Sequence, residues 1–167
     1  MEELISQLKK HRLGIIYILK MIPPSIWDWK PNISMRSTSE LALHLACSPL
    51  AILELLKGNI PDGESYKAFE DNNMTSDAQG MVLLYNKGLN RLIEYLEKHL
   101  TEARTENIEL FYEEHPTSLY KEVFSEIGHE WLHLGQLFIY LRQNGVSVDM
   151  GAYYGFRDPN PDIQPIK

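Results

Sequence analysis

The sequence predicts an all-α protein built as a four-helix bundle, and three observations support this fold class. Four long segments repeat apolar residues at the three- and four-residue spacing of amphipathic helices. Helix-start and helix-stop signals bound these segments, and the connecting stretches are rich in Pro, Gly, Asn and Asp. A chain of 167 residues is long enough for one domain with a buried core, so we treat residues 1–167 as a single domain.

The first long segment covers residues 2–22 and ends at Pro23-Pro24, which cannot continue a helix. Its apolar residues follow one seam, and His11 falls within the same series. We interpret His11 as a histidine at the edge of the core, or one that supports a metal ligand, rather than as a ligand itself. An irregular connector follows at residues 23–36.

The second long segment begins with a capping box formed by Ser37 and Glu40 and ends at Gly58. His44 lies on the apolar stripe of this helix, flanked by leucines. A lone histidine in that setting is more often a hydrogen-bonded core residue than a ligand. Cys47 lies three residues further on, and we interpret it as a small buried side chain.

The third long segment, residues 76–100, begins with another capping box, from Ser76 and Gln79. Between it and the second helix, residues 59–75 are rich in turn-forming residues. We expect a loop there that is long enough to cross the whole bundle.

The fourth long segment covers about residues 118–144 and ends at the helix-stop pair Asn144-Gly145. Apolar residues occupy two sides of this helix, and a polar stripe runs between them. A polar stripe flanked by apolar ones indicates a face turned toward a pocket or cofactor. Its members are Glu126, His129, His133, Gln136 and Tyr140. We expect the residues after the helix, 146–167, to form an irregular tail that packs across the bundle.

His129 and His133 stand four residues apart, so both imidazoles lie on one face of the helix and can reach one metal ion. The same letters spell H-E-x-x-H, the metalloprotease signature in which Glu130 would be the general base. Those proteases usually take a third ligand from downstream, but no Glu or His follows His133. The protease interpretation therefore fails. A third ligand must come from upstream, where the candidates are His11, His44, His99 and His115.

Composition excludes several classes of partner. The chain has 16 Lys and Arg against 23 Asp and Glu, a formal charge of −7, and no basic run. This charge argues against nucleic acid and against an anionic membrane surface. The single cysteine excludes an internal disulfide and fits a cytoplasmic location. We expect no signal peptide, because a charged amphipathic segment follows Met1, and no uninterrupted apolar run approaches ~18 residues.

Two stretches of the sequence resemble the DinB/YfiT-like superfamily. One is Ser39-Glu40-Leu41-Ala42-Leu43-His44; the other is His129-x-x-x-His133-x-Gly135-Gln136-Leu137 with Tyr140-Leu141-Arg142-x-x-Gly145. The resemblance spans nearly the whole chain. It implies a four-helix bundle whose second and third helices run parallel, and which binds one divalent metal through His44, His129 and His133.

The resemblance also implies chemistry. Characterised relatives include metal-dependent transferases that use low-molecular-weight thiols such as bacillithiol or mycothiol, so a small-molecule substrate and a homodimer are expected. Three neutral imidazoles leave zinc, nickel or iron with open positions for a thiolate or for water. The first hypothesis is a thiol S-transferase; the alternatives are a non-catalytic, dimeric metal-binding bundle and a hydrolase with Glu130 as base. Glu130 departs from the commonest pattern of the superfamily.

Overall fold

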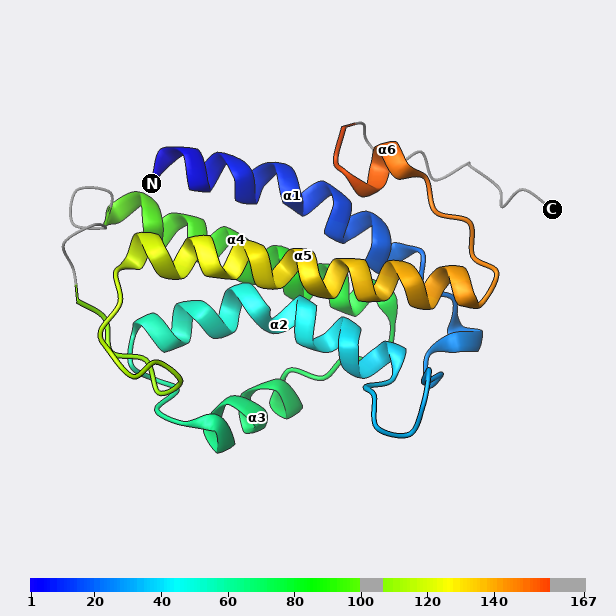
Figure 1. Cartoon of the computed structure of the whole chain (residues 1–167), viewed down its shortest axis with the longest axis horizontal. Helices are drawn as coiled ribbons and strands as arrows, with labels where there is room; N and C mark the ends of the chain where they lie inside the picture. Colours follow the sequence, from blue (N-terminus) through cyan, green and yellow to red (C-terminus); the bar gives the residue numbers. More distant parts are fainter. Residues whose placement is uncertain (100–106, 157–167) are drawn as a thin grey trace.

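Four long helices form the architecture of the protein, in a computed structural model that describes residues 1–99 and 107–156. Helices α1 and α2 each pack against both α4 and α5 (Figure 1). The prediction of an all-α fold is confirmed; the described residues contain one isolated antiparallel bridge, between Ile108 and Thr117, and no strand. The long helices are α1 (Glu2–Lys20), α2 (Thr38–Leu56), α4 (Ala78–Lys98) and α5 (Leu119–Gln143).

Helices α2 and α4 run in the same direction, opposite to α1 and α5 (Figure 1). A parallel pair needs a connection that crosses the length of the bundle, and residues 59–75 supply it. The connection is not a plain loop, because it contains helix α3 (Gly63–Asn72). The side chain of Asp62 starts this helix by accepting a hydrogen bond from the backbone N–H of Ser65 at 2.8 Å. Helix α3 packs on α2 and buries none of its residues fully.

One of the two expected capping boxes is present. Ser37 accepts from the backbone N–H of Glu40, and the Glu40 carboxylate accepts from the backbone N–H of Ser37 at 2.6 Å. The second box is wrong, because α4 begins one residue later than expected. There Asp77 is the cap and accepts from the backbone N–H of Gly80 at 2.8 Å. Aspartate caps a helix as well as serine does, so the sequence alone allowed either Ser76 or Asp77 as the cap.

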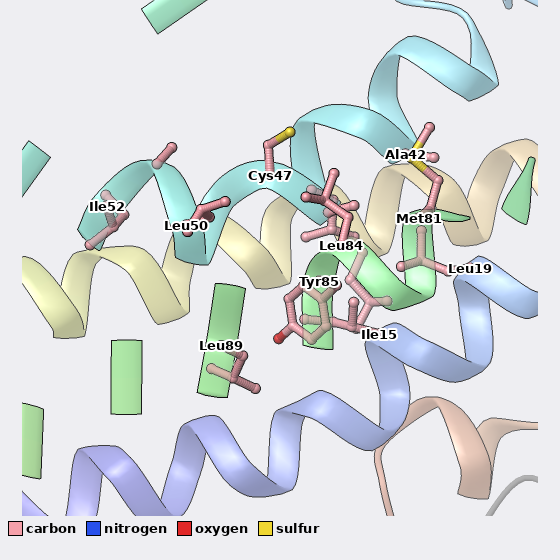
Figure 2. Close-up of a cluster of buried hydrophobic side chains, with 14 of the residues drawn as sticks. Ile15, Leu19, Ala42, Cys47, Leu50, Ile52, Met81, Leu84, Tyr85 and Leu89 are labelled. Atoms are coloured by element: carbon pink, nitrogen blue, oxygen red, sulfur yellow. The ribbon is translucent and has the colours of Figure 1, made fainter. Parts of the chain in front are cut away.

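The buried apolar cluster draws residues from α1, α2, α4 and α5, and Figure 2 shows part of it, with Ile15, Leu50, Tyr85 and Leu89 labelled. Gly88 on α4 allows a very close approach to α2, since a Cβ at this position would lie 2.9 Å from the backbone nitrogen of Leu50. Helix α2 is long and apolar enough to cross a membrane by length and composition, but 78% of it is buried inside the bundle. That burial is the setting of a core helix.

The chain after α5 returns to α1. Helix α6 (Met150–Tyr153) packs on α1, and the backbone N–H of Asp149 donates to the Tyr17 hydroxyl at 2.7 Å. Gly14 permits this contact, because a Cβ there would lie 2.1 Å from the carbonyl oxygen of Tyr153. The expected tail thus packs on the bundle as far as residue 156, through a short helix rather than irregular chain. Residues 157–167 lie outside the described part. A 3-10 turn, η1 (Pro24–Ile26), interrupts the connector after α1.

Candidate metal centre and its pocket

Three histidines from two helices meet at one point. His44 comes from the second turn of α2, while His129 and His133 lie one turn apart in the middle of α5. Because α2 packs against α5, the three rings face one another. The Nε2 atom of His129 lies 3.1 Å from that of His44 and 3.0 Å from that of His133. Among the described residues, these three form the group whose spacing suits one metal ion.

Two of these rings are held from behind by acceptor oxygens. The Nδ1 atom of His44 donates to the carboxylate of Glu70, which comes from α3. The Nδ1 atom of His133 lies 2.7 Å from Oε1 of Gln136. An acceptor at Nδ1 fixes the proton on that nitrogen and leaves a lone pair on Nε2, as in many metal-binding histidines. Burial lowers the pKa of His133 to about 4, so this ring is neutral at neutral pH.

The third ring lies next to a carboxylate of its own helix. The Nδ1 atom of His129 is 3.3 Å from the Ser48 hydroxyl and 3.5 Å from Oε2 of Glu126. Ser48 also donates a hydrogen bond to Glu126. Burial disfavours the charged imidazole, but the hydrogen bond and negative charge of Glu126 outweigh it and raise the pKa of His129. The same negative charge favours a cation bound at Nε2.

The arrangement of the three rings has one clear electrostatic meaning. With acceptors behind the Nδ1 atoms, the Nε2 lone pairs point at one another across about 3 Å. Such lone pairs repel unless a cation lies between them, and three imidazole nitrogens are the donor set of many zinc, nickel and iron sites. The residues present therefore fit a divalent metal.

A pocket of about 310 Å³ opens beside the histidines. This volume is at the lower end of the range for small-molecule sites. Its walls come from α2, α3, the segment before α5, and α5 itself. The lining residues are His44, Ile52, Leu55, Tyr66, Phe111, Tyr112, Glu122, Ser125, Glu126 and His129.

Three buried carboxylates occupy successive turns of α5, and each has a different partner. Glu122 accepts from the Tyr112 hydroxyl at 2.5 Å, and Glu126 accepts from Ser48. Glu130 is fully buried, and its Oε2 lies 3.2 Å from Nδ1 of His11. Glu122 and Glu126 line the pocket and Glu130 does not.

Glu130 was the sequence candidate for a catalytic base, and the structure places it beneath α1 instead. Its contact with His11, whose ring stacks on Trp131 at 4.0 Å, is a buried pair within the bundle. Burial and the charge of Glu126 raise the pKa of Glu130 well above its usual range. Glu130 thus points to a neighbouring helix, α1, rather than to solvent. The pocket-lining carboxylate closest to the histidines is Glu126.

The other candidate ligands lie apart from the site. His99 contacts the backbone oxygen of Tyr95 at the end of α4, and His115 is exposed in the segment before α5. Cys47 is buried, and burial together with the charge of Glu70 raises the pKa of its thiol to about 12. No role was predicted for Glu70, because it falls within residues 59–75, where a loop was expected. The Asp62 cap was the available signal that this loop contains a helix.

Comparisons with known proteins agree with this architecture. The sequence profile of the DinB family matches residues 1–164. A DinB-like protein from Bacillus subtilis superposes with a TM-score of 0.65 at 22% identity, covering 87% of this chain and 93% of that one. A DinB-like protein from Bacillus cereus gives 0.72 at 17% identity, covering 89% and 95%. Among functionally curated proteins, no sequence matches this chain significantly.

Proposed function

Because this chain belongs to the DinB family, we propose that it is a metal-dependent enzyme that binds one divalent ion through His44, His129 and His133 and acts on a small molecule. The observation that carries the proposal is the convergence of three Nε2 atoms, with two of the rings held from behind by acceptor oxygens, beside a pocket of about 310 Å³. A purely structural metal site has no need of an adjacent pocket, so this arrangement favours catalysis over a passive bundle.

The reaction that we propose is transfer to a low-molecular-weight thiol such as bacillithiol. A metal held by the three histidines would supply open positions and would lower the pKa of a thiol or water bound there. The chain's own contribution is the pocket, which holds the electrophilic substrate, and Glu126, which accepts the thiol proton. The sulfur then forms a bond to an electrophilic carbon as the bond from that carbon to its leaving group breaks, and the leaving group departs with the electron pair.

Hydrolysis with Glu130 as the base has no support from the geometry. Glu130 does not line the pocket, and its carboxylate is engaged by His11. A thiolate is therefore the preferred nucleophile. Cys47, the single cysteine of the sequence, is a free buried thiol, which fits a protein that functions in a reducing cytoplasm.

The family resemblance suggests a homodimer, and one surface supports it. The outward face of α5 exposes three large apolar side chains about two turns apart: Phe124, Leu132 and Ile139, which are 65%, 59% and 52% exposed. Clustered apolar exposure of this kind marks interaction surfaces in soluble proteins. We place the dimer interface on this face.

The test of the proposed function starts with protein purified without a nickel column and analysed for bound metal. We expect about one zinc, nickel or iron per chain. Replacement of that metal by Co²⁺ makes the site visible, because a thiolate bound to cobalt gives a charge-transfer absorption band. Addition of bacillithiol to the cobalt protein should produce the band. A protein that holds stoichiometric cobalt but shows no band with any low-molecular-weight thiol would refute thiol transfer and leave the metal site intact.

A further inference from the structure

Glu122 is a buried acidic side chain whose burial the metal centre does not explain. It lies two turns before His129 on α5, and only 5% of it is exposed. Glu126 is accounted for by its contacts with Ser48 and His129. Glu122 touches no histidine, and its protein partner is the Tyr112 hydroxyl, which donates to Oε1 at 2.5 Å. One hydrogen bond is little compensation for a desolvated carboxylate.

The second oxygen of Glu122 has no hydrogen-bond donor among the described residues, and the side chain lines the pocket. Burial raises the pKa of Glu122, and the charges of Glu126 and Glu113 act in the same direction. The carboxylate therefore stands in a negative region. A donor or a positive charge that enters the pocket would satisfy it.

Among the residues that the structure describes, no Lys or Arg lines the pocket to compensate the two carboxylates. Two cations lie near its edges: Lys121 beside Glu122 and Arg36 toward His133, and both side chains are exposed. Burial and the charges of Glu70 and Glu126 raise the pKa of Tyr66, another lining residue.

The remaining walls are apolar. Ile52 and Leu55 from α2 face Phe111 from the segment before α5, and together they form a wall for a hydrocarbon body. About 10 Å of helix axis separates Glu122 from His129, at ~1.5 Å per residue. A ligand anchored on Glu122 through a short spacer would therefore extend to the histidines.

We propose that this pocket selects a cationic amine with a compact apolar or aromatic body, and that the ammonium group binds the free oxygen of Glu122. This inference rests on the proposed function for the site of reaction, because the far end of the ligand is the part presented to the metal centre. In this proposal the pocket binds the electrophilic substrate that reacts with the thiol. Glu122 and Glu126 disfavour an anionic substrate at this end of the pocket.

The test uses three probes that share one body and differ in charge: phenethylamine, 2-phenylethanol and 3-phenylpropanoate. Binding to the zinc-loaded protein is measured by calorimetry. We expect the amine to bind about tenfold more tightly than the alcohol, because its ammonium group makes a charge-assisted hydrogen bond to the carboxylate. The carboxylate should bind most weakly.

Glu122→Gln should reduce amine affinity about tenfold, to that of the alcohol, and leave alcohol affinity within twofold. Glu114→Gln is the matched control, because it removes the same charge from an exposed position outside the pocket. Tyr112→Phe keeps the carboxylate and should keep the amine preference. Equal binding of all three probes, no binding of any, or an amine preference that survives Glu122→Gln would overturn the inference.

Metal analysis of each variant separates this inference from the proposed function. Glu122 contacts no ligand histidine, so Glu122→Gln should retain full zinc. If the unaltered protein binds no metal yet still prefers the amine, the proposed function fails and the amine site stands. If metal and the cobalt–thiolate band are normal but the preference is missing, the amine site fails alone.

Discussion

At the scale of single residues, no other histidine among the described residues is placed to replace His44, His129 or His133 as a metal ligand. His11 is engaged by Glu130, and His99 contacts the end of its own helix. We therefore predict that alanine at any one of positions 44, 129 and 133 abolishes stoichiometric metal binding. The helical circular dichroism should remain, because the core beneath the site is apolar. Elemental analysis and circular dichroism measure both outcomes.

His11→Ala and His115→Ala are the controls for this prediction, and both should keep their metal. Full metal in His44→Ala together with loss in either control would show that α2 does not supply the third ligand.

Cys47 gives a second prediction at this scale. Burial raises the pKa of its thiol to about 12, so the reactive thiolate is absent at pH 8. We expect a disulfide reagent such as DTNB to leave the folded protein unmodified for hours and to react with one thiol per chain in denaturant. Because the pKa is raised, Cys47 holds its thiol proton more tightly in the folded state than in the unfolded state. Cys47 therefore destabilises the fold only as the pH rises above 9.0, the ordinary pKa of the thiol. Rapid modification of the folded protein would show that Cys47 is accessible.

At the scale of elements, helix α3 links the surface of the bundle to the three histidines of the candidate metal centre. It buries none of its residues fully, yet its Glu70 holds the Nδ1 proton of His44. Carboxylates in this position typically contribute 10- to 100-fold in metal affinity. We predict that Glu70→Gln weakens zinc binding by about this factor, as measured by competition with a chelator. Glu64→Gln, on the exposed side of the same helix, should change nothing.

Equal affinity in the two variants would mean that the Glu70 carboxylate does not orient His44. A loss in both would instead indicate that α3 acts through its total charge.

The long helices could be predicted from the sequence because apolar residues recur along them at helical spacing and start and stop signals bound them, even though α2 is buried on nearly all sides. His129 and His133 were predictable for the same reason, since their spacing is set within one helix. Glu70 was not, because its contact with His44 joins residues 26 apart and no local pattern encodes it. The partner of Glu130 could not be predicted either. Apolar residues lie on two sides of α5, and only the packed bundle shows that Glu130 turns to α1.

At the scale of the whole molecule, the exposed apolar face of α5 leads to a prediction about assembly. Leu132 lies between Phe124 and Ile139 on that face, so a charge there would be buried without compensation in the proposed interface. We predict that light scattering gives the unaltered protein twice its chain mass of 19.4 kDa, and Leu132→Glu a single chain mass.

Leu83→Glu is the matched control, because Leu83 is also an exposed leucine, 61% accessible, but lies on α4. It should remain dimeric. A monomeric unaltered protein, or a Leu132→Glu variant that keeps the doubled mass, would remove this face of α5 as the interface.

The close contact between α4 and α2 has a consequence for metal selectivity. Gly88 brings the backbones together so tightly that one added methyl group would have to displace α2. His44 lies on α2, and the two histidines that it faces, His129 and His133, lie on α5. Coordination bonds tolerate deviations of only about 0.2 Å. A larger residue at position 88 would therefore move His44 relative to His129 and His133, and so change the radius of the ion that the three histidines could accept.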